Sequence, residues 1–587
     1  MRRRGCDAAP TGEVTVSWSA VGRQVLRASL LAACATLVCG GARAEELHVR
    51  VEVRPTRPLG RISQYIFGAG IDAKTNPLRA PRYPQQVARD IAESGLRIAR
   101  YPGGFVFCRD EHRGSWANFY WQDHLGMNPE GDPTEVYDLD AFVQLCERFS
   151  IEPLMQINFV GEPQESVQGY LEYLVGDGDV DGDGVNWAAR RAANGRQEPY
   201  HIRYWQLGNE VHSYPQGFHE NAEGAREYAR ALDRFVPVIR RMSPGSKVVV
   251  PLINVQRPRS EMRLEPDDVD INFATSSEFA RAFLQNLNVK VDYFDWHFYP
   301  ANGWGGTWPY LGTDDEWKHY YCWGTKFREC YAAVNDLISA ECRQDPLPQI
   351  IVGEWSGDWT GAIFREHESS FRGSMMRTMA SGVFMADILM FMMEKSVPPE
   401  HIHAAFWHAF CNDAQALFSI QTTHEQGLSY KGRSTDEGYG FRMPIYWVFK
   451  LLSEQRGEDL VESDLQGENL IAAPQDGLYT DPEYAFQRVT HCASRSGDRL
   501  YLALLNKDAH RLVTVQLNIA DWKLQPAVEV YEVGADSYLA ENTIEAPDCV
   551  TLRRPQTRRM QDLHGMEYDL RPNTLAVLQF QQVTHDR

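Results

Sequence analysis

Eight short apolar runs between residues 65 and 410 constrain the fold of this chain more than any other feature. Strands buried on both faces of a parallel sheet are continuously apolar, whereas half-buried strands alternate with polar residues. These runs are of the first kind, and longer helical patterns separate them. The runs are residues 65–71, 96–104, 153–160, 202–209, 248–255, 291–299, 349–355 and 403–410. Eight strand–helix units in succession predict a (β/α)8 barrel.

The segments between the runs have the period of amphipathic helices. In residues 137–149 the apolar side chains recur at spacings of three and four residues, and Asp138 is a candidate N-cap. The same pattern predicts helices over residues 222–242, 276–287, 326–340 and 374–394.

The sequence changes in character after about residue 445. Short alternating segments follow, broken by Gly, Asp and Asn, and they predict an antiparallel β-sandwich. Residues 46–53 are also strand-like, and we expect them to join the same sheet. The expected α/β architecture is an N-terminal strand in residues 45–60, a TIM barrel in residues 61–445 and a β-sandwich in residues 446–587.

The first 44 residues have the features of an export signal. Several arginines up to Arg27 precede the uncharged run 28–42, and residues 42–44 ("ARA") form a small-x-small cleavage site. The run is too short to cross a bilayer, which takes about 20 apolar residues. A lipoprotein signal at residues 31–34 is the less favoured alternative, because it leaves few apolar residues after Arg27. We therefore expect residues 1–44 to be a signal peptide and the mature protein to be periplasmic or extracellular.

The composition is that of a globular protein, with 43% hydrophobic and 24% charged residues. The first 44 residues hold six Arg and two acidic residues, so the net charge of −20 becomes −24 without them. Such a charge repels nucleic acid and anionic lipid, and it suits an exported protein that acts on neutral material. We therefore expect neither a nucleic-acid nor a membrane partner. The sequence leaves the oligomeric state open.

Cysteine usage excludes two further classes of site. No CxxC or HExxH motif is present, which argues against a thiol-redox centre and a zincin site. An exported protein can pair cysteines, and Cys322, Cys330 and Cys342 form the closest group.

Two of the expected strands end in a carboxylate. Glu210 follows "GN" at the end of the run 202–209, and Glu354 lies near the end of the run 349–355. In a (β/α)8 barrel the chemistry sits at the carboxyl ends of the strands. A carboxylate pair there suits glycoside hydrolysis, in which one group is a general acid and base and the other is the nucleophile. Each Glu alone would as readily cap a helix, so the pair carries the prediction.

Polar residues at other strand ends support this site. His297 and Tyr299 lie two residues apart and therefore on one face of their strand. His297 could orient a carboxylate or a sugar hydroxyl, and Tyr299 could donate to the nucleophile. Arg100, in "ARYPGG", lies at the end of the second expected strand and would help to keep one carboxylate ionised. The alternative for each is a purely structural role.

The chain resembles glycoside hydrolase clan A, and most closely family 51, the α-L-arabinofuranosidases. The resemblance rests on residues 62–68 ("ISQYIFG"), 100–104 ("RYPGG"), 190–210, which end in "YWQLGNE", 440–461 and the closing strands near 540–580. It implies that Glu210 is the acid/base, that Glu354 is the nucleophile and that no cofactor is required. It also implies that Asn209, His297, Tyr299 and Gln415 bind the sugar.

Two positions depart from the family pattern. Asp72 stands where the family usually has Glu, and Phe105 stands where it usually has Asn or Cys. The resemblance places both positions against the sugar at the cleaved bond. Since Phe offers no side-chain hydrogen bond, the sugar specificity of the family does not transfer with its catalytic pair.

Two further segments are unusual. Residues 303–324 follow the sixth strand and are rich in Trp and Tyr, so Trp304 and Trp308 are candidates for stacking on sugar rings; the alternative is a self-packed loop. The segment 177–184 begins like a calcium loop, with Asp179, Asp181 and Asp183 as candidate ligands of a structural calcium ion. Its twelfth position is Arg190 instead of the usual Glu, so a solvated acidic turn is the alternative.

The sequence therefore predicts a retaining glycosidase acting on a carbohydrate partner. The lead substrate is a non-reducing-end α-L-arabinofuranoside of a polysaccharide. The same mechanism on a β-xyloside, a β-glucoside or a uronic acid polymer is the alternative. A non-catalytic carbohydrate-binding protein on a glycosidase scaffold is the alternative from another class.

Overall fold

The computed structural model of this 587-residue chain describes sixteen parts of it. They are residues 47–71, 85–103, 121, 139–160, 163–211, 218–219, 221–253, 276–300, 316–357, 377–399, 402–412, 417–420, 440–473, 485–543, 546–559 and 564–583.

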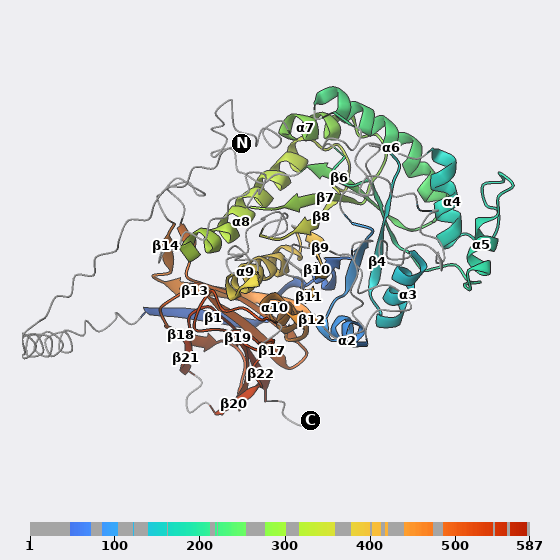
Figure 1. Ribbon diagram of the computed structural model, residues 1–587. Helices are drawn as coiled ribbons and strands as arrows, with labels where there is room; N and C mark the ends of the chain where they lie inside the picture. Colours follow the sequence, from blue (N-terminus) through green and yellow to red (C-terminus); the bar gives the residue numbers. More distant parts are fainter. Residues whose placement is uncertain are drawn as a thin grey trace, which may run out of the picture. The chain divides into compact units, whose positions relative to one another are not determined.

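Eight parallel strands close into a barrel (Figure 1). In order they are β2 (Gly68–Gly70), β3 (Ile98–Tyr101), β4 (Glu152–Ile157), β5 (Tyr204–Leu207), β6 (Lys247–Ile253), β7 (Tyr293–Phe298), β8 (Gln349–Trp355) and β9 (Ile402–Trp407). Each strand overlaps one of the eight apolar runs, and β9 pairs back onto β2. The predicted barrel is confirmed.

Helices surround the barrel (Figure 1). They are α2 (Gln85–Ser94), α3 (Leu139–Phe149), α4 (Gln164–Val175), α5 (Trp187–Ala193), α6 (Ala222–Met242), α7 (Ser276–Asn286), α8 (Glu316–Glu341) and α9 (Met379–Lys395). The bounds of α6 are those predicted, because Asn221 caps its first turn by accepting from the backbone of Glu223 and Gly224. None of the helices in the described residues is long and apolar enough to cross a membrane.

Helix α8 begins ten residues earlier than its predicted start at residue 326. The segment was expected to be part of an aromatic loop, but Trp317, Tyr320 and Tyr321 recur at helical spacing and are buried. Tyr321 also donates from its hydroxyl to Asn573 Oδ1 at 2.8 Å. These aromatic side chains therefore pack inside the protein, whereas Trp304 and Trp308 lie outside the described residues.

The C-terminal part is rich in antiparallel strands, and it takes the N-terminal strand β1 (Leu47–Arg61) as predicted. β1 pairs with β13 (Asp459–Gly467), and the backbone carbonyl of Val53 accepts from Ala520 N at 2.9 Å on its other side. Nine strands share one sheet in the order β20-β19-β22-β17-β16-β13-β1-β18-β21. The others are β16 (Val489–Ser496), β17 (Arg499–Asn506), β18 (Val513–Ile519), β19 (Leu524–Gly534), β20 (Gln556–Arg559), β21 (His564–Leu570) and β22 (Thr574–Gln582).

Smaller elements complete the described chain. They are η1 (Gln64–Ile66), β10 (Cys411–Asn412), β11 (Phe418–Ile420), β12 (Gly440–Arg442), α10 (Pro444–Glu454), β14 (Leu470–Ala472) and β15 (Ala485–Gln487). The candidate cysteine group, Cys322, Cys330 and Cys342, forms no disulfide.

A buried ion cluster links the barrel to the sheet domain. Asp387 on α9 accepts from Arg328 Nη2 on α8 at 2.8 Å and from Lys507 Nζ, just after β17, at 2.9 Å. Burial alone would raise the pKa of Asp387, but the two cations hold it below its usual range. Gly324 makes room for this carboxylate, since a Cβ there would lie 1.8 Å from Asp387 Oδ2.

Replacing Asp387 by Ala should lower the free energy of unfolding by about 3–5 kcal/mol, because the change leaves Lys507 buried without its counter-charge. Urea unfolding followed by far-UV circular dichroism measures this loss. Asp336→Ala is the matched control, because Asp336 lies exposed on α8. Equal stability of the two variants would contradict the structural role of the cluster.

Candidate active site

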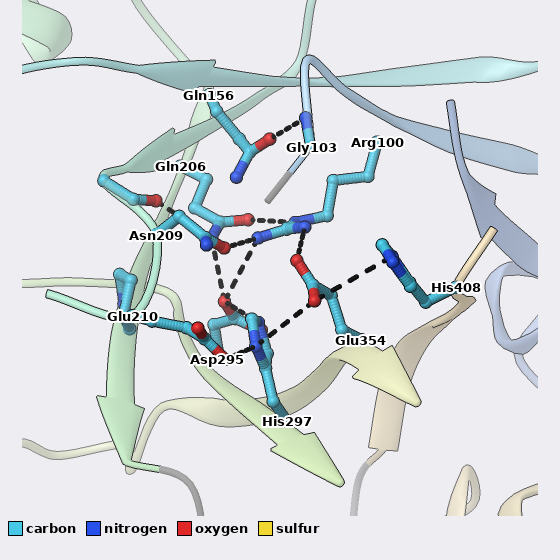
Figure 2. A network of polar contacts seen from close by, with 12 residues as sticks. Arg100, Gly103, Gln156, Gln206, Asn209, Glu210, Asp295, His297, Glu354 and His408 are labelled. Atoms are coloured by element: carbon cyan, nitrogen blue, oxygen red, sulfur yellow. Dashed lines mark hydrogen bonds and ion pairs between the residues drawn. The ribbon is translucent and has the colours of Figure 1, made fainter. Parts of the chain in front are cut away.

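The inward-facing side chains of the barrel strands change from apolar to polar toward the carboxyl ends. Ile98, Tyr204 and Tyr293 lie in a buried apolar cluster inside the barrel. Two residues further along the same strands, and therefore on the same face, come Arg100, Gln206 and Asp295. The polar side chains form the connected network shown in Figure 2.

The tip of β5 turns sharply after the strand ends. Gly208 has φ +79°, and a Cβ there would lie 2.6 Å from Val211 Cγ1, so a side chain would not fit. Glu210 itself has φ +41°, a conformation that is uncommon for residues other than Gly and clusters at functional sites. The turn thus directs Glu210 into the polar network, where Figure 2 shows it beside His297.

Glu354, near the end of β8, is buried and bonded through both of its oxygens. Oε1 accepts from Arg100 Nη1 at 2.7 Å, and Oε2 accepts from the Tyr299 hydroxyl at 2.7 Å. Burial alone would raise the pKa of Glu354, but the charges of His297 and Arg100 outweigh it and hold the pKa well below its usual range. Glu354 is therefore an ionised carboxylate, the state that a nucleophile requires.

His297 connects the second carboxylate to the network. Its Nδ1 lies 2.8 Å from Glu210 Oε1, and its Nε2 lies 3.1 Å from Asp295 Oδ2. Burial opposes the charged ring, yet Asp295 and Glu354 raise the pKa of His297 to about 10. Because the ring is then an imidazolium, it donates to Glu210 and to Asp295.

Arg100 also orients the neutral side chains beside the two carboxylates. Its Nε donates to Gln206 Oε1 at 2.9 Å, and its Nη2 donates to Asn209 Oδ1. Asn209 is 1% exposed, so the amide next to Glu210 is held firmly in place.

The two glutamates are close together. One carboxylate oxygen of Glu210, one of Glu354 and a ring nitrogen of His297 all lie within 4.8 Å of one another. Retaining glycosidases have carboxyl groups roughly 5–5.5 Å apart, whereas inverting ones need roughly 6.5–9.5 Å for a water molecule. The spacing fits the retaining geometry.

The structure brings together six of the residues named from the sequence: Arg100, Asn209, Glu210, His297, Tyr299 and Glu354. Asp72, Phe105, Gln415, Trp304 and Trp308 lie outside the described residues.

The sequence reasoning missed Gln206, Asp295 and His408. Gln206 Nε2 donates to Asp295 Oδ2 at 2.8 Å, and His408 Nδ1 lies 3.9 Å from Glu354 Oε2. Each is a polar residue within or next to an apolar run, and that interruption of the pattern was the available signal.

The structure brings two of the three candidate calcium ligands together. Asp179 and Asp181 lie with Glu172 of α4, one oxygen of each being within 4.8 Å of the others, but Asp183 is not in this group. Asp183 Oδ1 accepts from Val185 N at 2.7 Å, and Asp179 accepts from two backbone amides of the same loop. The carboxylates therefore bond the turn itself.

Tyr299→Phe should reduce kcat/KM by about 10- to 100-fold, because a hydrogen bond to a charged group is worth about 1.5–3 kcal/mol. The change removes the hydroxyl that bonds Glu354 Oε2 and leaves the ring. Steady-state kinetics measure the loss. Tyr293→Phe is the control, since Tyr293 is the first residue of β7 and lies in the buried apolar cluster inside the barrel. A Tyr299→Phe enzyme as fast as the wild type would contradict this role.

Comparisons with known proteins agree with this geometry. The family model "Alpha-L-arabinofuranosidase 1 domain" matches residues 94–304, and "Alpha-L-arabinofuranosidase C-terminal domain" matches residues 413–573. A curated relative, "Probable alpha-L-arabinofuranosidase C" of Aspergillus clavatus, is 29% identical over 206 residues. The match covers 33% of this chain and only 37% of that relative's length.

Solved structures resemble nearly the whole chain. The GH51 α-L-arabinofuranosidase from Thermotoga petrophila RKU-1 has a TM-score of 0.67 at 19% identity, and the match covers 90% of this chain and 99% of that one. CelM2, a bifunctional glucanase-xylanase from a metagenome library, has a TM-score of 0.55 at 12% identity, with 92% and 99% covered. At these identities the likeness shows the shared fold.

Proposed function

Because this chain belongs to glycoside hydrolase family 51, the α-L-arabinofuranosidase family of clan A, we propose that it is a retaining glycosidase. The lead substrate is a non-reducing-end α-L-arabinofuranoside of a polysaccharide. The chemistry uses the two glutamates and requires no cofactor.

In the first step, a Glu354 oxygen forms a bond to the anomeric carbon while the bond from that carbon to the leaving oxygen breaks. Glu210 gives its proton to the leaving oxygen, so the alcohol departs neutral. The Tyr299 hydroxyl and Arg100 position the attacking carboxylate through its two oxygens. The product is a covalent glycosyl ester of Glu354.

In the second step, water attacks the anomeric carbon and the ester bond to Glu354 breaks. Glu210, now a carboxylate, takes the proton from the water. Glu354 returns to its ionised state and Glu210 to its protonated state, and the anomeric configuration is retained after two inversions.

The observation that carries this proposal is the proximity of the two carboxylates in different surroundings. Glu354 is held ionised by cations and the Tyr299 hydroxyl, whereas Glu210 accepts from His297. Two carboxyl groups in one site that differ in this way are suited to different roles.

A panel of aryl glycosides tests the proposal. The purified protein is assayed on arabinofuranoside, xyloside, glucoside, galactoside and uronide. We expect hydrolysis of the arabinofuranoside, with the retained anomer formed first as seen by proton NMR. Binding of oligosaccharides without turnover of any member would favour the non-catalytic carbohydrate-binding alternative.

A second candidate substrate is another glycan, such as a β-xyloside, a β-glucoside or a uronic acid polymer. Asp72 and Phe105 favour it, because both differ from the family pattern at positions that the resemblance places against the sugar. CelM2, which has the same fold, is a bifunctional glucanase-xylanase. Activity on one of these glycosides, with none on the arabinofuranoside, would select this candidate.

We also propose that residues 1–44 direct export and are removed. The uncharged run 28–42 and the "ARA" site support this proposal. Expression of the full chain in a Gram-negative host should release a protein that starts at Glu45 into the periplasm, as read by N-terminal sequencing. A cytosolic protein with an intact N-terminus would contradict it.

A further inference from the structure

His297 lies among three carboxylates, which hold it in different ways (Figure 2). Nδ1 lies 2.8 Å from Glu210 Oε1 and 3.8 Å from Glu354 Oε2, and Nε2 lies 3.1 Å from Asp295 Oδ2. The side chain of Asp295 is 0% exposed, whereas those of Glu210 and Glu354 are 15% and 8% exposed. Only the last two can therefore meet a substrate.

Two of these three charges change during the proposed reaction. Glu354 becomes a neutral ester when the sugar is attached, and Glu210 loses and then regains a proton. Asp295 is sealed from the substrate and forms no bond in either step. It is the carboxylate that can hold the charge of His297 steady throughout the cycle.

Asp295 lies beside charged groups, but only one of its two carboxylate oxygens accepts hydrogen bonds from the described residues. Its Oδ2 accepts from Gln206 Nε2 at 2.8 Å as well as from His297, and Arg100 Nη2 lies 3.9 Å away. Its Oδ1 is buried and accepts no hydrogen bond from the described residues. Burying a carboxylate oxygen without a hydrogen bond costs free energy, so its presence here needs an explanation.

The chain also makes room for this unbonded oxygen. A Cβ on Gly353 would lie 1.8 Å from Asp295 Oδ1, so the residue next to Glu354 has no side chain where this carboxylate lies. The strand β8, which carries Glu354, thus has a glycine at its contact with Asp295.

We propose that Asp295 is a positioning residue that keeps His297 protonated in both reaction steps, so that Nδ1–H always donates to Glu210. This inference rests on the proposed function and assigns a role to a residue that does not touch the substrate. Its effect falls on the second step, in which Glu210 must be a carboxylate to accept the proton of water.

The charges that face His297 support this role. Burial would lower the pKa of His297, and Asp295 is the leading cause among those that instead raise it to about 10. Among the described residues, Arg100 on β3, Glu210 after β5, Tyr228 on α6 and Glu354 on β8 are the other titratable or charged groups that face His297 or Asp295. Tyr299 after β7 and His408 after β9 face Glu354. In the glycosyl ester Glu354 no longer contributes a charge, so the contribution of Asp295 matters most there.

Asp295→Asn tests the proposal because it keeps the shape and removes the charge. The amide oxygen can still accept from His297 Nε2–H, and a neutral ring then presents its Nδ1 lone pair to Glu210. Glu210 would keep its proton as the donor to Nδ1 and would be a poor base for water. We expect the second step to slow by about 10- to 100-fold, the loss typical when a residue that orients a metal-binding histidine is removed.

The measurement is rapid-quench kinetics with a nitrophenyl glycoside that the wild type hydrolyses. We expect a burst of about one nitrophenolate per enzyme molecule. The rate of the second step should reach its plateau at a higher pH than in the wild type. Azide should restore turnover, because it attacks the glycosyl ester without the help of a base. The control is Asp292→Asn, since Asp292 lies just before the same strand but bonds Arg240 and Lys247. It should show none of these changes.

Two results would overturn the inference. One is an Asp295→Asn enzyme with the pH profile of the wild type and no burst. The other is an equal loss in both steps at every pH, which indicates a structural role. In the His297→Gln background Asp295→Asn should add no further change in the pH profile, and an added shift would also contradict action through His297.

If Asp295→Asn does not fold, ring-15N NMR of the histidines in the wild type measures the protonation of His297 directly. The His297 signals, identified by their loss in His297→Gln, should show two protonated ring nitrogens at about pH 8 in the free protein and in the glycosyl ester. A singly protonated ring in the ester would overturn the inference. Failure of the proposed function is distinguishable, because the wild type would then turn over no glycoside at all.

Discussion

Glu354→Ala is expected to lower kcat by roughly 10⁴- to 10⁶-fold, the range for loss of a covalent nucleophile. The change removes the only carboxylate that both Arg100 and the Tyr299 hydroxyl position in the described part of the chain. Steady-state hydrolysis of an aryl glycoside measures the loss. Azide should restore turnover by occupying the space of the lost carboxylate, and the glycosyl azide should have the inverted configuration because only one displacement occurs.

The control for this variant must separate chemistry from folding. Removing Glu354 takes one counter-charge away from the buried Arg100 and His297, so thermal unfolding of Glu354→Ala is compared with that of Glu354→Gln, which keeps the volume. Both variants should remain folded at the assay temperature and both should be inactive without azide. Substantial hydrolysis by a folded Glu354→Gln protein would mean that another group attacks the sugar.

Glu210→Ala is expected to lower kcat/KM by about 10²- to 10⁴-fold for substrates whose leaving group needs a proton, since general acid catalysis contributes this much. For a dinitrophenyl glycoside the first step needs no proton, so the loss there should be small and the glycosyl ester should accumulate. Azide should then give a glycosyl azide of retained configuration.

The dependence on the leaving group is the decisive feature of this second variant. Comparison of dinitrophenyl, nitrophenyl and alkyl glycosides of the same sugar gives the slope of the rate against leaving-group acidity. A steeper slope in Glu210→Ala than in the wild type is expected. An equal slope would show that Glu210 does not protonate the leaving oxygen.

The barrel was predictable because its strands are buried on both faces and stand out as apolar runs, as "YWQL" of β5 and "QIIVGEW" of β8 do. The location of Glu210 and Glu354 at strand ends then followed from the architecture. The start of α8 differs from the prediction, because a segment dense in Trp and Tyr also fits an aromatic loop, whereas in the structure its spacing is helical and its rings are buried. Aromatic residues indicate a loop that binds sugar only when they are exposed.

The polar network beneath the glutamates could not be derived from the sequence. Gln206 and Asp295 come from strands that are not neighbours, and their hydrogen bond forms only because the closed barrel points both side chains inward. In the sequence each is a single polar residue in an apolar run. Gly353 likewise has no local signature, since its role depends on Asp295 of the adjacent strand.

The central claim is that Glu354 forms a covalent bond to the sugar, and peptide mapping tests it most directly. The Glu210→Ala protein is mixed with a dinitrophenyl glycoside of the preferred sugar, quenched in acid, digested and analysed by mass spectrometry. The account predicts one glycosyl group per molecule, on the peptide that carries Glu354 and at that residue. A glycosyl group on another residue, or turnover with no adduct and an inverted product, would contradict it.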